Sequence, residues 1–203
     1  MSKQHIKTIA YIRHIKTLYI LCVLLTVQIS ALSLFSEALA DDFDVADKKV
    51  KRLSPDSYKE LPRDIIKKLV HLGCSIPQSI GSKHQHNVIA GEFARQGQKD
   101  WAILCSIQQV SSVRVFWGGD SACSSVILTS KDRNWLQNTG RDIQYSRMIN
   151  PVNKQFIVEH SIVYGKAISN NIRHQGIEEL FVGKGSTVHY CENGKWKTLP
   201  GAD

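Results

Sequence analysis

The first forty residues constrain where this chain can fold, because they contain the three parts of a secretory signal peptide in order. Basic residues at positions 3, 7, 13 and 16 come first, an apolar stretch runs from about 18 to 34, and Ala38-Leu39-Ala40 provides a small-x-small cleavage site. The apolar stretch is only just long enough to span a bilayer, which requires about 20 residues. We therefore expect cleavage near Ala40 rather than an uncleaved anchor, and a mature protein that is periplasmic or secreted.

Four cysteines remain after this cleavage, and an even number of cysteines in an exported chain indicates disulfide bonds. They are Cys74, Cys105, Cys123 and Cys191. Three pairings are compatible with four cysteines, and we favour Cys74 with Cys105 and Cys123 with Cys191. None of them lies in a Cys-x-x-Cys motif, so the sequence favours neither redox chemistry nor a thiolate zinc site.

The mature chain, residues 41–203, is long enough for one domain with a genuine core. Removing four basic residues and one acidic residue with the signal peptide lowers the formal net charge from +8 to +5. This excess suits an acidic partner and equally suits simple solubility. No later segment is apolar enough to span a membrane, so we expect a soluble mature form.

Charge and hydrophobic periodicity divide the mature chain into a tail and a domain. Residues 41–54 pass from an acidic block to a basic block with little apolar content, which predicts a flexible charged tail. Residues 55–203 are predicted to form a single α+β domain. It begins with a helix over Pro62–Leu72 that Gly73 terminates, followed by strands over 87–93, 100–105 and 112–117 that form an antiparallel meander.

The C-terminal part contains a second hairpin. Asn193-Gly194 is a strong signal for a two-residue turn and joins strands over 186–191 and 196–199. We predict one antiparallel sheet built mainly from the meander and this hairpin, with one or two packed helices. Residues 126–128 are a candidate strand, and 151–164 have helical spacing although their β-branched content favours a strand nearly as much. The predicted core residues are Phe93, Trp101, Ile103, Val115, Val188 and Trp196.

Gly91-Glu92-Phe93, then Gly97, then the run 100–104 form a pattern around the first hairpin. This pattern resembles one FG-GAP/VCBS-type repeat, in which several Asp residues of the turn bind calcium. Here the turn at 94–99 contains no carboxylate. The resemblance therefore implies a hairpin of that shape that lacks the calcium site.

A second resemblance covers most of the mature chain, from about residue 61 to 203. The matching pieces are the sequences at 73–78 (GCSIPQ), 97–106 (GQKDWAILCS), 174–178 (HQGIE) and 194–203 (GKW to GAD). They are similar to a family of uncharacterised secreted bacterial proteins. The resemblance implies export and a single domain, and it transfers no catalytic residue.

Two groups of histidines are candidates for polar sites. His84 and His86 would present two imidazoles on one face of a strand as a metal pair, but no third ligand is near in sequence, which favours a polar loop. His160 and His174 flank a loop with Glu178 close by, which defines a candidate His/Glu site. A structural role is the favoured interpretation of this group, and we expect neither a metal nor a cofactor.

No motif in the chain specifies a reaction. The candidate serines at 106, 111, 112 and 146 lie in neither Gly-x-Ser-x-Gly nor Ser-x-x-Lys, and there is no phosphate loop. Bases alternate with aromatic residues around Arg114 and at Lys195, Trp196 and Lys197, and these four residues form the candidate binding surface. In an exported protein this pattern favours an acidic protein or an anionic envelope polymer over nucleic acid.

These observations predict an exported, non-enzymatic binding or envelope-associated protein. The alternative is a small periplasmic hydrolase that uses His160 or His174 with a nearby carboxylate. The two differ in whether these histidines and an acid converge in one cleft.

Overall fold

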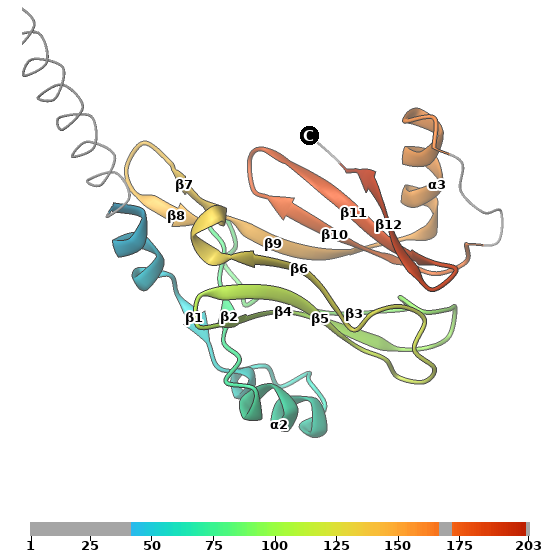
Figure 1. The fold of residues 1–203 in the computed structure, drawn as a ribbon, viewed down its shortest axis with the longest axis horizontal. Coiled ribbons are helices and arrows are strands. Elements are labelled where there is room, and N and C mark those ends of the chain that lie inside the picture. Colours follow the sequence, from blue (N-terminus) through green and yellow to red (C-terminus); the bar gives the residue numbers. More distant parts are fainter. Residues whose placement is uncertain (1–41, 167–171, 202–203) are drawn as a thin grey trace, which may run out of the picture. The chain divides into compact units, whose positions relative to one another are not determined.

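The computed structural model describes residues 42–166 and 172–201 of the chain (Figure 1). The predicted signal peptide lies outside this range. Within it, no helix has the length and apolar character needed to cross a membrane.

Eight of the strands form two four-stranded antiparallel sheets. The first sheet has the order β3-β4-β5-β6, with bounds Val88–Gly91, Asp100–Ile107, Val110–Phe116 and Val126–Lys131. The second sheet has the order β12-β11-β10-β9, with bounds Lys195–Pro200, Gly185–Glu192, Gly176–Phe181 and Arg147–Val152. The predicted α+β class is confirmed. The prediction of one shared sheet is wrong, because the hairpin β11–β12 pairs with β10 and not with the meander.

The central strand β4 of the first sheet is buried on both faces. Strand β4 alternates its side chains between the faces, and all but its last residue are buried. Helix α2, Arg63–His71, packs its buried Ile65 and Leu69 on the face that carries Trp101 and Ile103. As predicted, the helix begins after Pro62 and ends before a glycine of positive φ, Gly73 at 68°.

The second sheet lies between the first sheet and helix α3, Lys154–Val163 (Figure 1). At the β9 edge of the second sheet, the buried Asn87 amide joins the sheets by donating to the Arg147 carbonyl and accepting from the Ile149 N–H. On the face towards α3, Ile157 packs with Val188 and its neighbours. The helix predicted over 151–164 is thus confirmed from residue 154, whereas Pro151 belongs to β9.

Short elements complete the fold. They are β1 (Arg52–Leu53), β2 (Ile76–Pro77), β7 (Leu136–Asn138), β8 (Ile143–Tyr145) and the 3-10 helices η1 (Pro55–Ser57) and η2 (Asp132–Trp135). β1 pairs with β2, and β7 with β8. The hairpin β11–β12 turns through Asn193 and Gly194, both of positive φ, as a two-residue turn requires.

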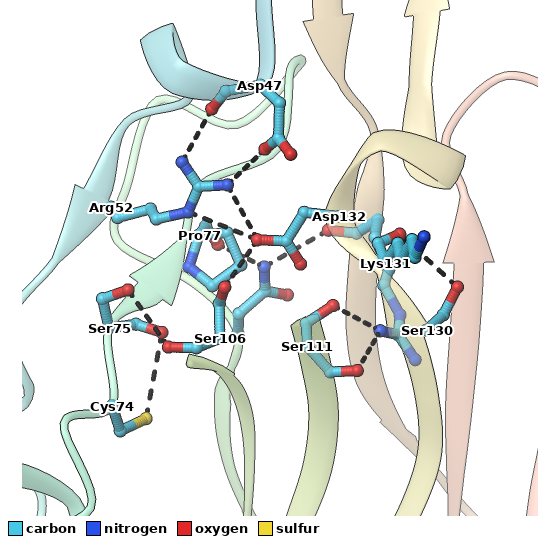
Figure 2. Close-up of polar contacts among 12 residues, drawn as sticks. Asp47, Arg52, Cys74, Ser75, Pro77, Ser106, Ser111, Ser130, Lys131 and Asp132 are labelled. Carbon is cyan, nitrogen blue, oxygen red and sulfur yellow. Dashed lines mark hydrogen bonds and ion pairs between the residues drawn. The ribbon is translucent and has the colours of Figure 1, made fainter. Parts of the chain in front are cut away.

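The predicted flexible tail at 41–54 is wrong over the part that the structure describes. Residues 42–49 are helical and Arg52 begins β1. Figure 2 shows the Arg52 guanidinium between the carboxylates of Asp47 and Asp132, which is fully buried. Asp132 is 80 residues further along the chain, so charge composition around residue 50 could not reveal this partner.

Both disulfides have the favoured pairing. Cys74–Cys105, with Cα atoms 5.5 Å apart, links the end of α2 to β4. Cys123–Cys191, at 6.0 Å, links the loop before β6 to β11 and therefore joins the two sheets. Of the predicted core residues, only Trp196 is not buried.

Candidate binding groove

A groove of about 810 Å³ lies between α2 and the adjacent end of the first sheet. We call it the basic groove. Its walls come from α2, from the residues around the start of β4, and from β5 with the loop that follows it. Its volume falls within the range of about 300–1,000 Å³ that is typical of ligand pockets.

The charges that line the basic groove are mainly positive. Lys68, Lys99 and Arg114 line it, against one carboxylate, Asp64. Arg114 lies in the middle of β5, and its Nε is buried without a hydrogen-bond partner. An unsatisfied buried donor costs roughly 1–3 kcal/mol, and more when it is charged. Arg114 as a whole is half-buried and lines the groove, so a ligand carboxylate there would pair with its guanidinium.

Aromatic side chains form the other part of the basic groove. Trp101 of β4 lies opposite Phe116 of β5 in the sheet register, and both line the groove. The Lys99 ammonium lies 4.8 Å from the centre of the Trp101 ring, which is a cation–π distance. Trp117 lines the groove next to Phe116, so the groove combines positive charge with flat apolar surface.

Trp196 supports Trp117 from the second sheet. The two rings stack with centroids 6.1 Å apart, and the Trp196 indole donates to the Ser124 carbonyl at 2.9 Å. The Trp117 indole donates to Ser125 Oγ at 3.0 Å. Trp196 was predicted as a core residue, and its half-buried position follows from this contact at the edge of the groove.

The structure divides the predicted binding surface. Arg114 lines the basic groove, and Trp196 borders it through Trp117. Lys195 and Lys197 are exposed and alternate with Trp196 along β12, so they lie on the opposite face of that strand. Neither of these two lysines lines the groove.

One buried carboxylate positions the rim of the groove. Asp100 accepts hydrogen bonds from the backbone N–H groups of Phe93, Ala94 and Gly118 and from the Gln98 amide, at 2.8–3.0 Å. These bonds tie the turn before Lys99 to the end of β5. A Cβ on Gly118 would lie 2.0 Å from the Lys99 carbonyl oxygen, so only glycine fits this close approach.

The β3–β4 hairpin therefore uses Asp100 mainly for contacts with backbone N–H groups. In the part of the chain that the structure describes, no group of three or more His, Cys, Asp or Glu side chains is placed to hold a metal ion. His84 and His86 lie in a loop before β3, as the favoured interpretation requires. There His86 Nε2 accepts from the Ser79 N–H at 2.7 Å.

The candidate His/Glu site is not assembled. His160 stacks on Phe156 of its own helix, with ring centroids 3.8 Å apart. His174 donates from Nδ1 to a neighbouring backbone carbonyl, and Glu178 accepts from Ser186 Oγ at 2.7 Å. No hydrogen bond or ion pair in the described ranges joins His160, His174 and Glu178, so this geometry offers the hydrolase alternative no support.

A buried ionic cluster between the sheets was not predicted. Arg147 of β9 is fully buried and pairs with Glu179 of β10 at 2.5 Å. It also donates to Ser111 Oγ of β5 at 2.6 Å and to the Leu128 carbonyl of β6. His189 Nε2 lies 3.7 Å from the Glu179 carboxylate, too far for a hydrogen bond. The cluster joins the two sheets through side chains.

The cluster changes the titration of its members. Burial raises the pKa of Glu179, but the neighbouring His189 and the Arg147 guanidinium outweigh burial and hold this pKa below its ordinary value. Burial, together with the charge of Asp132, raises the pKa of the Tyr145 hydroxyl. Glu179 is thus an ionised partner of Arg147 at neutral pH.

Arg114 and Trp196 were predicted as binding residues from the sequence, whereas Lys68, Lys99 and Trp117 were not. The alternation of Lys99 with Trp101 was an available signal, because two residues apart on an extended chain share one face. Lys68 carried no such signal, since it resembles any exposed base on a helix.

No family model, no curated protein and no solved structure matches the chain.

Proposed function

We propose that this is an exported, non-enzymatic binding protein whose basic groove holds an acidic segment of a partner protein. The observation that carries the proposal is the grouping of three cations, Lys68, Lys99 and Arg114, around a groove whose lining includes one carboxylate, Asp64. A ligand carboxylate would accept charge-assisted hydrogen bonds from these donors.

The walls of the groove favour a polypeptide over an anionic polymer. Trp101, Phe116 and Trp117 line it together with the exposed edges of Leu72 and Val126. An acidic peptide that also carries apolar side chains would cover these surfaces and neutralise the cations. A uniformly polar polymer would leave the aromatic surface in contact with water.

Export is part of the same proposal. Two disulfides are typical of proteins that fold in an oxidising compartment, and the signal-peptide pattern supplies the route. N-terminal sequencing of the exported protein should begin at Asp41. An exported product that retains its first forty residues would contradict cleavage at Ala40.

Binding can be tested with a synthetic peptide in which glutamate alternates with leucine, measured by fluorescence anisotropy. The double variant Lys99→Gln/Arg114→Gln should weaken binding by at least about tenfold, because one charge-assisted hydrogen bond contributes roughly 1.5–3 kcal/mol. The matched control, Lys195→Gln/Lys197→Gln, removes the same charge outside the groove. It should change the affinity by less than about threefold, as expected for exposed charges.

Two further probes separate the alternatives. The same peptide with glutamine in place of glutamate should not bind, and polyglutamate without apolar residues should bind more weakly. Tighter binding of polyglutamate than of the mixed peptide would favour an envelope polymer. Equal loss in the two double variants would show a nonspecific charge effect and would refute the groove as the site.

A further inference from the structure

We propose that a second pocket, next to the β1–β2 pair, binds a phosphate group. This phosphate pocket has a volume of about 360 Å³ and lies between residues 46–51, the loop 78–86 and the start of β8. The phosphate pocket shares no lining residue with the basic groove, so the two proposals are independent.

The phosphate pocket is lined by bases from two distant parts of the chain. Lys49 and Lys51 come from the N-terminal segment, and Lys83 and His84 come from the loop before β3. No aspartate or glutamate lines it. The pairing of β1 with β2 brings these parts together, and the Gln78 N–H donates to the Lys51 carbonyl at 2.8 Å.

Asp47, the one acidic residue among residues 45–53, does not line the pocket. Asp47 is buried and pairs with Arg52, which also binds the buried Asp132 (Figure 2). The adjacent lysines at 49 and 51 remain exposed. The ion pairs of Arg52 thus keep Asp47 buried, whereas the exposed Lys49 and Lys51 line the pocket.

Hydrogen bonds hold the loop of the pocket at both ends. The Gln78 amide donates to the Tyr58 hydroxyl at 2.8 Å, and that hydroxyl donates to the His86 carbonyl at 2.7 Å. The Ile80 N–H donates to the Tyr145 carbonyl at 2.8 Å. His86 Nε2 accepts a hydrogen bond from the Ser79 N–H, so the His86 ring holds the loop and this nitrogen is not free to bind a ligand. The pocket is preformed, which lowers the entropic cost of binding.

A phosphate group fits this lining better than a carboxylate does. Lysine ammonium groups act as point charges towards phosphate, whose oxygens accept from several directions at once. The Gln85 and Gln144 amides add neutral donors at the pocket. The lining lacks the arginine that planar, bidentate recognition of a carboxylate would use.

The test compares two triple variants of the oxidised protein. Lys49→Gln/Lys51→Gln/Lys83→Gln empties the pocket of its lysines, and Lys59→Gln/Lys67→Gln/Lys154→Gln removes the same charge at exposed positions outside it. Binding of inorganic phosphate is measured by calorimetry, with acetate as the carboxylate comparison. We expect the pocket variant to lose at least about tenfold in phosphate affinity, which corresponds to about 1.4 kcal/mol.

Vesicles of phosphatidylglycerol form a second arm that identifies the source of the phosphate. Loss of vesicle binding in the pocket variant alone, without binding of inorganic phosphate, assigns the pocket to lipid headgroups. Pocket-dependent binding of inorganic phosphate assigns it to a soluble phosphate compound. Equal losses in the two variants, no binding of either probe, or tighter binding of acetate would overturn the proposal. Lys99→Gln/Arg114→Gln should leave both measurements unchanged, which separates this proposal from the proposed function.

Discussion

Replacement of Arg147 by alanine should destabilise the protein more than most single substitutions. Arg147 is fully buried, pairs with Glu179 at 2.5 Å, and donates to Ser111 Oγ at 2.6 Å. Its guanidinium also lies 4.6 Å from the centre of the Trp135 ring. The substitution leaves the Glu179 carboxylate buried without its cation, and breaking a buried pair in this way costs about 3–5 kcal/mol. Because whole domains are stable by only about 5–15 kcal/mol, the loss should be easy to detect.

Urea denaturation of the oxidised protein measures this loss as a shift of the midpoint at constant slope. Arg147→Ala combined with Glu179→Gln should be less destabilising than the sum of the two single variants, with a coupling energy of roughly 0.5–3 kcal/mol. Arg147→Lys should also destabilise, because an ammonium cannot serve Glu179, Ser111 and Leu128 with one planar group.

A loss of less than about 1 kcal/mol for Arg147→Ala, the level of an ordinary substitution, would refute a structural role for this ion pair. Strict additivity of the two single effects would refute it as well, since residues in one ionic network should couple. Either result would mean that apolar packing alone holds the two sheets together.

Three further predictions concern the same framework. The folded-state pKa of Glu179 lies below its ordinary value of 4.5, so ionised Glu179 contributes stability that is complete above about that pH and is lost as the pH falls through the folded-state pKa. Glu179→Gln should therefore reduce the loss of stability at acid pH in a curve of stability against pH. An unchanged loss at acid pH would contradict the pairing. Asp100→Ala leaves four donors without their acceptor and should cost at least about 3 kcal/mol in urea denaturation, with Asp120→Ala, an exposed neighbour, as the control. Replacing Cys123 and Cys191 by serine opens a loop with a sequence separation of 68 and should cost about 4 kcal/mol in the chain-entropy model, whereas a loss below about 1 kcal/mol would show that the bond constrains little.

Local patterns were sufficient to predict most of the individual elements. The i, i+3 and i+4 spacing of apolar residues and Gly73 located α2, and the apolar run 100–105 located a strand that is buried on both faces. Asn193-Gly194 located the C-terminal hairpin, because both residues tolerate the positive φ of a tight turn. The pairing of four cysteines also agreed with the expectation from their order along the chain.

The candidate site was predicted only in part. Arg114 and Trp196 were selected because bases alternate with aromatic residues there, yet Lys195 and Lys197 in the same pattern point away from the groove. Alternation along one strand shows which residues share a face and does not show what that face meets. The position of α2 decides that the face of Arg114 is the floor of a groove.

Tertiary structure alone decided how the pieces combine. It placed the meander and the hairpin in separate sheets, folded residues 45–53 onto the domain, and gave Arg52 and Arg147 partners that lie 80 and 32 residues away in sequence. The physical reason is that local and tertiary structure depend on interactions of different range along the chain. Helix periodicity, strand alternation and turn conformation are set by neighbours within a few residues, whereas strand pairing and burial of an ion pair depend on which distant surfaces exclude water together.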